Sequence, residues 1–192
     1  MSLLGNDRYG VLRAPHGLSV VQELLNTAAS GNPRLPDLLD DAAAADGWLW
    51  ELHTSVDRSD AISMESLTDS ELHTLRELRT SLSAAIATEP EVTPFLADVR
   101  LTLNAAGWVE PVPEERPCAW LASTIMLEGF LAQRSGDWKR LKICANPDCS
   151  VSFFDRSRNR SGVWHDVHVC GNAINLKASR SRRRAQSAPI NS

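Results

Sequence analysis

The sequence lacks the features that mark secreted and membrane proteins. It has four cysteines in 192 residues, and no apolar leader with a cleavage-like end follows Met1. These absences disfavour a disulfide framework and predict a reducing, cytoplasmic environment. No apolar run reaches the roughly 18 to 20 residues that a membrane span requires, because polar residues interrupt even the most apolar stretch, residues 118–132. We therefore expect no membrane partner.

Recognisable catalytic motifs are also missing. The chain has no glycine-rich phosphate loop, no nucleophile elbow and no paired-carboxylate motif. His16, His53 and His73 are isolated histidines on or near predicted helices, where histidine is more often a surface or core residue than a catalyst. We therefore expect that the protein is not an enzyme.

Charge is distributed very unevenly along the chain. The formal net charge is −4. Residues 137–192 contain eleven basic and four acidic residues, a net +7, whereas residues 1–136 contain nine basic and twenty acidic residues, a net −11. A cationic module beside an acidic body is the pattern expected when only one part meets a polyanion. The alternative is a solvated basic tail that docks on the acidic domain of the same chain.

Apolar periodicity predicts a mainly helical N-terminal domain over residues 1–136. The predicted helices span residues 17–30, 37–52, 68–89 and 118–133. Thr68, with Glu71 three residues later, has the capping-box pattern at the start of the third helix. The fourth helix is apolar over much of its circumference, so we expect it to be the central core helix. The predicted core includes Trp48, Trp50, Trp120, Met126 and Phe130.

A change of period between the third and fourth helices predicts a small β element. Residues 99–103 alternate as in a strand, residues 104–107 suit a turn, and residues 108–110 can return as the partner strand. The fold class is therefore mainly α with a small β element, and a small separate module follows at the C-terminal end.

The most specific chemical signal is a pair of matched spacings near the C-terminus, Cys144-x4-Cys149 and His165-x4-Cys170, with fifteen residues between them. Zn²⁺ takes thiolate and imidazole ligands tetrahedrally, and a short loop closes each pair around one ion. We therefore predict one structural zinc held by Cys144, Cys149, His165 and Cys170. His168 is the alternative to His165.

The rest of the module, residues 137–185, is basic and contains three aromatic residues. Phe153, Phe154 and Trp164 are predicted to form a small core on one side of the zinc site, with base stacking as the alternative. Residues 172–184 are predicted to form a helix, and residues 186–192 a disordered tail. The candidate nucleic-acid contacts are the cations of the loop and helix: Arg156, Arg158, Arg160, Lys177, Arg180, Arg182, Arg183 and Arg184.

The residues around the metal ligands resemble those of a known family. Residues 140–149, residues 153–160, Trp164 and Cys170-Gly171-Asn172 are similar to the CGNR-type zinc finger. Members commonly join this finger to an N-terminal helical domain called ABATE, described as a stress-induced bacterial transcription regulator. The resemblance is specific over roughly residues 138–184 and looser over the helices that begin at Gly17.

Two positions depart from the family pattern. The family usually has cysteine where this chain has His165, an exchange that zinc tolerates because imidazole nitrogen and thiolate sulfur are both ligands. The fourth signature residue is usually arginine, where this chain has Ala173, so one cation is missing.

The resulting hypothesis is a zinc-binding transcription regulator whose basic module contacts duplex DNA. The helical domain would sense a small-molecule effector or form a homodimer. Two alternatives remain open: a ligand-binding or protein-interaction module whose finger is purely architectural, and a protein whose target is RNA.

Overall fold

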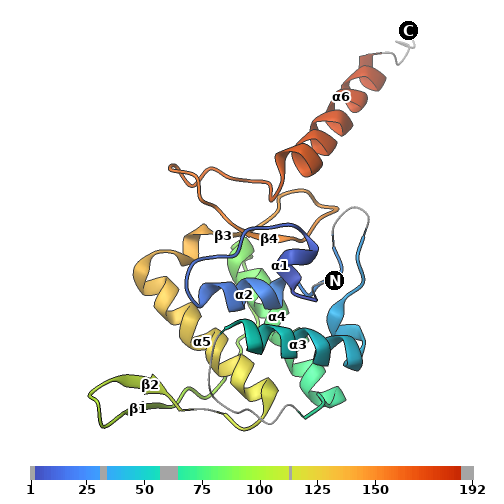
Figure 1. Ribbon diagram of the computed structural model, residues 1–192. Helices are drawn as coiled ribbons and strands as arrows, with labels where there is room; N and C mark the ends of the chain where they lie inside the picture. The colour runs from blue at the N-terminus through green and yellow to red at the C-terminus, as the bar shows by residue number, and fades with distance from the viewer. Residues whose placement is uncertain (1–2, 31–33, 57–64, 113, 187–192) are drawn as a thin grey trace.

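The predicted helices and the predicted hairpin follow one another in the expected order, and a second small hairpin, which was not predicted, lies in the C-terminal module (Figure 1). The computed structural model describes residues 3–30, 34–56, 65–112 and 114–186. The helical body consists of α1 (Gly5–Arg8), α2 (Leu18–Leu25), η1 (Leu38–Asp40), α3 (Ala42–Ser55), α4 (Asp69–Ala87) and α5 (Pro117–Ser135). The other elements are β1 (Leu101–Leu103), β2 (Val109–Pro111), η2 (Trp138–Arg140), β3 (Leu141–Ile143), β4 (Ser152–Phe154), η3 (Val167–Gly171) and α6 (Asn172–Gln186). The fold class, mainly α with a small β element, is confirmed.

Capping residues determine where the helices begin. The Thr68 hydroxyl accepts the Glu71 N–H, and the Glu71 carboxylate accepts the Thr68 N–H at 2.9 Å, which confirms the capping box before α4. Asp37 caps η1 and Asp41 caps α3. The single helix predicted over residues 37–52 is therefore divided, because its two acidic caps each start a separate helical segment.

The most buried helix is α2, and this corrects the prediction that α5 is the central helix. Seven of the eight residues of α2 are buried, and the helix packs against α1, α4 and α5. In contrast, α5 keeps one side in solvent, where Phe130 is 60 % and Leu131 48 % exposed. A helix apolar around most of its circumference is thus only partly covered here.

Two aromatic residues predicted for the core lie at the surface. Trp48 is completely buried, but Trp50 is 56 % exposed, since two residues of helix rotate its side chain to the opposite face of α3. On α5, Trp120 is buried and Met126 is half-buried. Phe130 lies on the exposed side, because the buried row of α5 passes through its neighbour Gly129.

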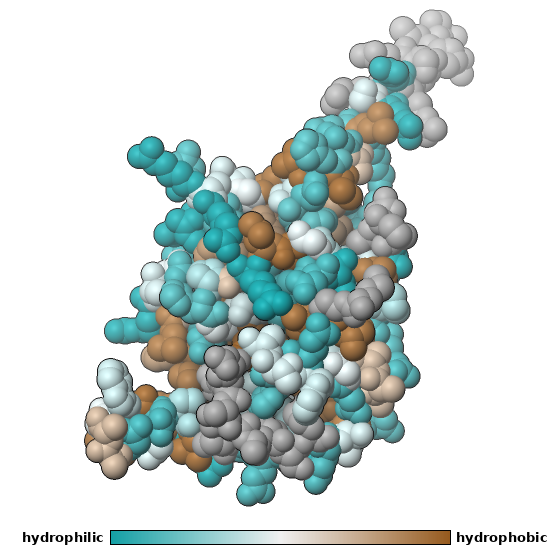
Figure 2. Space-filling model, viewed as in Figure 1, coloured by the Kyte–Doolittle hydropathy of each residue, from teal (hydrophilic) through white to brown (hydrophobic). Residues whose placement is uncertain are grey.

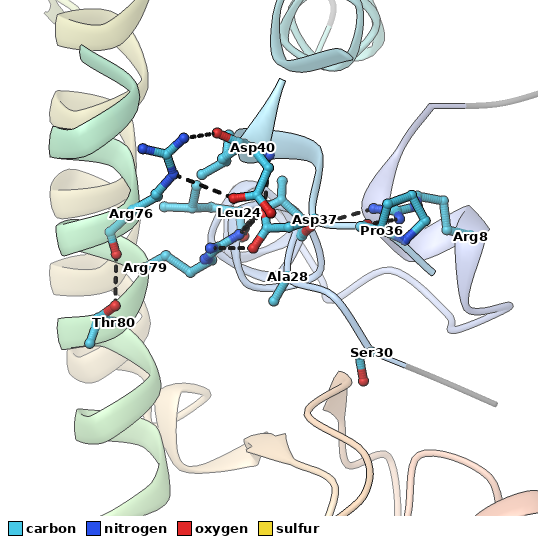
Figure 3. Close-up of polar contacts among 12 residues, drawn as sticks. Arg8, Leu24, Ala28, Ser30, Pro36, Asp37, Asp40, Arg76, Arg79 and Thr80 are labelled. Carbon is cyan, nitrogen blue, oxygen red and sulfur yellow. Dashed lines mark hydrogen bonds and ion pairs between the residues drawn. The ribbon is translucent and has the colours of Figure 1, made fainter. Parts of the chain in front are cut away.

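A partly buried ion pair fixes η1 against α4 (Figure 3). The Arg79 guanidinium donates to both carboxylate oxygens of Asp37, at 2.7 and 2.6 Å, and the Leu39 N–H donates to the same carboxylate. Burial alone would raise the pKa of Asp37, but the Arg79 hydrogen bonds lower the pKa below its ordinary value. Arg76, one helical turn away, donates to the Leu39 carbonyl.

Within the described ranges, no helix combines the length and the apolar character needed to cross a bilayer. The domain division at residue 136 stays a prediction. Residues 187–192, most of the predicted tail, lie outside the described residues.

Two substitutions on α5 test the observed burial. Leu121→Ala removes a completely buried side chain and should lower the free energy of unfolding by about 3 kcal/mol. Phe130→Ala should lower it by less than about 1 kcal/mol, because the ring already contacts water. Denaturant unfolding measures both. Equal decreases would contradict the exposed position of Phe130.

Glu23 gives the fold a specific pH dependence. Burial raises the pKa of its carboxyl from 4.5 to about 7, although the Asn6 and Gly5 N–H groups donate to it. The folded state therefore binds this proton more tightly than the unfolded state. The contribution to stability is complete below about pH 4.5 and is lost as the pH rises through about 7, a fall of about 3 kcal/mol in the free energy of unfolding.

Glu23→Gln should remove this dependence, because an amide does not titrate. Unfolding free energies of both proteins at about pH 5.5 and about pH 8 provide the comparison. The same slope in wild type and variant would assign the pH dependence to another group.

Candidate metal centre

The four predicted ligands come from the loop that connects β3 to β4, which carries Cys144 and Cys149, and from two short segments after β4, which carry His165 and Cys170. Cys144 directly follows β3, and Cys149 lies three residues before β4. The loop between them is tight: the Cys149 N–H donates to the Asn146 carbonyl at 2.8 Å, and the Cys144 N–H donates to the Val151 carbonyl at 2.9 Å. Cys170 lies in η3, five residues after His165. The fold thus brings two chelating pairs to one point.

The distances between the ligand atoms fit one tetrahedral ion. The three sulfur atoms and the imidazole nitrogen lie within 4.8 Å of one another. His165 Nδ1 is 3.5 Å from Cys149 Sγ and 3.6 Å from Cys170 Sγ. Zn–S bonds of about 2.3 Å and a Zn–N bond of about 2.05 Å at tetrahedral angles place nitrogen and sulfur about 3.6 Å apart. The set is therefore arranged for one structural zinc ion.

His168 has no place in this ligand set. Its side chain is exposed, and its backbone N–H donates to the Asp166 carboxylate at 2.6 Å. Asp166 also accepts the Val169 N–H, and these two bonds cap the helical turn that carries Cys170. Of the two histidines, the geometry selects His165.

Burial and the hydrogen bonds between the thiols change their pKa values in different directions. A hydrogen bond shared with Cys144 raises the pKa of Cys149 to about 11, and burial adds to this rise. The same hydrogen bond lowers the pKa of Cys144, and burial raises the pKa of Cys170. Three thiolates so close together repel one another, and a divalent ion offsets this repulsion.

Polar side chains from both parts of the chain surround the ligands. Asn146 Nδ2 donates to Cys170 Sγ at 3.3 Å, and the Ser30 hydroxyl donates to Cys149 Sγ at 3.7 Å. Ser30 Oγ also accepts the Ser150 N–H at 2.8 Å, while the Tyr9 hydroxyl accepts the Ser30 N–H. Such outer contacts orient ligands and hold their charge. Sequence analysis missed Ser30, because the Gly-Asn-Pro that follows it indicates only the end of a helix.

The β3–β4 hairpin is packed into the helical body. Asn26, the residue that caps the C-terminal end of α2, accepts the Ser152 N–H at 2.8 Å and donates to the Ser152 carbonyl at 3.0 Å. Leu141 belongs to the main core, and Phe154 packs against that core. This corrects the expected aromatic cover: Trp164 packs beside the zinc ligands, whereas Phe154 faces the helical body. Phe153 is buried.

Asp155 organises the basic loop that follows β4. Its carboxylate accepts from Lys142 Nζ at 2.7 Å and from the N–H groups of Ser157 and Gly162. Burial would raise the pKa of Asp155, but the bonds from Lys142, Ser157 and Gly162 hold it far below its ordinary value. A permanent negative charge therefore closes the loop and neutralises Lys142.

The three arginines of this loop differ in their contacts with the rest of the protein. Arg156 donates to the Arg13 carbonyl at 2.7 Å and lies 5.7 Å from the centre of the Phe154 ring, so it ties the loop to the N-terminal segment. Arg158 and Arg160 are exposed.

The cations of α6 lie on a helix that projects away from the body (Figure 1). Arg180 and Arg183 are exposed. Lys177 Nζ lies 3.6 Å from the Asp148 carboxylate, but both side chains are more than 70 % exposed, so this pair is weak. The side chains of Arg182 and Arg184 lie outside the described residues. Ala173 is exposed on the first turn, where the family arginine would stand at the surface.

Together, the helical body and the packed hairpin with its four ligands define a two-part protein with a structural zinc module at its C-terminal end. Residues 18–133 match the ABATE family, described as "Putative stress-induced transcription regulator", and residues 140–183 match the CGNR zinc finger. The chain therefore belongs to the ABATE family and carries a CGNR zinc finger, as its sequence indicated. No curated protein matches the chain.

Purified protein should contain about one zinc ion per chain, and Cys144→Ser or Cys170→Ser should release it, because four ligands share one ion. Elemental analysis of the reduced protein measures the content. His168→Ala is the matched control and should keep its zinc, since His168 lies outside the ligand set. Zinc-free wild-type protein, or release of zinc from His168→Ala, would contradict the assignment.

Proposed function

We propose that this protein is a cytoplasmic transcription regulator that binds duplex DNA through its zinc module. The single observation that carries the proposal is the placement of α6. This helix begins at Asn172, next to the zinc ligand Cys170, and stands clear of the helical body (Figure 1). It contains five cations, residues 177, 180 and 182–184, and no acidic residue.

The physical chemistry of α6 suits a polyanion. A helix fits the major groove of B-DNA, and each lysine or arginine that reaches a phosphate releases condensed counterions. Leu176 is 52 % exposed, so the helix presents both its cations and an apolar side chain to solvent. Arg158 and Arg160 add two exposed cations on the loop that Asp155 closes.

In this mechanism zinc would hold the base of α6 in place. Cys170 is buried at the base of α6, and η3 continues directly into the helix. Four protein ligands complete a tetrahedral coordination sphere and leave no position for a water nucleophile, so we also propose that the metal has no catalytic role. In this proposal the helical body supplies effector sensing or self-association.

One observation favours a second candidate, an interaction module with an architectural finger. The hairpin that carries two of the ligands is held tightly by Asn26 of the helical body, and Arg156 is occupied by the Arg13 carbonyl. A finger built mainly to complete the fold would make such contacts. The exposed cations of α6 have no role in that candidate, and we therefore favour DNA.

Replacing Arg180 and Arg183 together by glutamine should weaken binding to duplex DNA of any sequence. The log–log salt dependence should flatten by about 0.9 for each phosphate that the helix no longer neutralises. Fluorescence anisotropy over a range of salt concentrations measures both effects, with single-stranded DNA and RNA as comparison ligands.

The matched control is Arg34→Gln with Arg134→Gln, which removes the same charge from exposed positions of the helical body. It should leave the slope unchanged, and zinc content should be unchanged in both double variants. If wild-type protein binds no duplex DNA at about 50 mM salt, the DNA proposal is wrong and the architectural finger replaces it.

A further inference from the structure

A pocket lies at the junction of the helical body and the zinc module, where the last turn of α4 meets β3 (Figure 1). Its volume is about 650 Å³, within the range of about 300 to 1,000 Å³ that is usual for small-molecule sites. The lining comes from both parts of the chain: residues 85–88, 138–139, 141–145 and 162–163. A ligand in this pocket would therefore contact the helical body and the zinc module together.

The backbone of β3 presents an unpaired donor on the side of this pocket. The Cys144 N–H donates to the Val151 carbonyl in the β3–β4 ladder, and backbone groups alternate along a strand, so Ile143 points its N–H and C=O away from β4. The Ala145 N–H points to the same side and donates to the carbonyl of Val163, which lines the pocket. Among the described residues, no hydrogen bond uses the backbone groups of Ile143. The Ile143 N–H is therefore available to a ligand.

The charge of the lining favours an anionic ligand. Two lysines, Lys139 and Lys142, line the pocket, and no acidic residue is among the described residues that line it. The Lys142 ammonium is already paired with the Asp155 carboxylate at 2.7 Å. The Lys139 side chain is exposed, and no described residue forms an ion pair or hydrogen bond with it. One ammonium group is therefore free to bind an anion.

The C-terminal end of α4 opposes this preference only weakly. Helix C-termini carry a partial negative charge, because their last carbonyl groups lack partners within the helix. Here the Thr88 N–H donates to the Ala85 carbonyl and the Glu89 N–H donates to the Ala84 carbonyl, so two of these carbonyl groups are paired. The whole ammonium charge of Lys139 outweighs the partial charge that is left.

The remainder of the lining is largely apolar and includes one aromatic ring. Ile86, Ile143 and Val163 contribute aliphatic side chains, and several alanines widen the space between them. Trp138 packs against the main core but is only half-buried, so part of its ring faces the pocket. Aromatic rings pair favourably with other rings, in stacked or edge-to-face contacts. The lining therefore suits a ligand with a flat apolar body.

We propose that this pocket binds a small aromatic carboxylate. The ring of the ligand lies against Trp138 and the aliphatic side chains, and its carboxylate pairs with the Lys139 ammonium, with the Ile143 N–H as a further donor. Hydrogen bonds between charged groups are roughly twice as strong as those between neutral groups. An inorganic anion would leave the apolar lining uncovered, and a neutral aromatic compound would leave the ammonium without a partner.

The location of the pocket suits an effector site, a role that rests on the proposed function, whereas binding of the carboxylate does not. The lining includes the zinc ligand Cys144, so a bound ligand would lie beside the metal site that holds the base of α6. None of the residues that line the pocket belongs to α6, which projects from the body with both hydrophilic and apolar side chains at its surface (Figure 2). The ligand and DNA therefore use different residues.

Isothermal titration calorimetry of the zinc-loaded full chain, without DNA, tests the site with naphthalene-2-carboxylate as the probe. The wild-type dissociation constant should be below about 1 mM, and the neutral amide of the same shape should bind about tenfold more weakly. Lys139→Gln should raise the dissociation constant of the carboxylate about tenfold and leave that of the amide unchanged. Arg34→Gln is the matched control: it removes an exposed cation outside the pocket and should change neither constant.

A second variant, Ala85→Phe, fills the pocket from an exposed position of α4 and should abolish binding of both compounds, with circular dichroism and zinc content as in wild type. The proposal is overturned if wild-type protein binds no carboxylate, if it binds the amide equally well, or if Lys139→Gln has no effect. Each of these results leaves DNA binding untouched. Loss of DNA binding in a protein that still binds the carboxylate would contradict only the proposed function.

Discussion

The paired hydrogen bonds between the Asn26 side chain and the Ser152 backbone join the two parts of this protein. The Asn26 amide is buried, and its remaining N–H reaches Asn6 Oδ1 at 2.7 Å, so both of its polar atoms have partners. A buried backbone group without a partner costs about 1 to 3 kcal/mol. The Asn26 side chain at the C-terminal end of α2 therefore helps to position β4, and with it the zinc ligands on either side.

Metal binding and core packing are consequently parts of one structure. Leu141 lies in the main core, and Cys144, three residues later, points to the metal site. The Ser30 hydroxyl contacts a ligand sulfur from the helical body. A zinc module of this size buries little apolar surface by itself. It gains its stability from the ion on one side and from the helical body on the other.

The sequence predicted those features whose signals are local. The ligand spacing, the Thr68 capping box and the β1–β2 turn each involve residues close together in the chain, and all three were confirmed. The errors concern packing between distant segments. Trp50 and Phe130 were assigned to the core as large apolar residues on helices with an apolar pattern, whereas the exposure of each side chain depends on which helices pack nearby. Asn26 and Ser30 gave no signal, because their partners lie more than a hundred residues away.

The projecting helix α6 makes angular precision at its base important. It has fifteen residues, so its far end lies about 22 Å from Cys170. A tilt of about 10° at the ligand would move that end by about 4 Å, roughly the 3.4 Å rise between neighbouring base pairs of a duplex. A lever of this length transmits small rotations at its pivot as large displacements at its tip. The Asp166 cap and the four metal ligands restrict rotation at the base of α6. They thereby determine how precisely the C-terminal end of the helix is positioned.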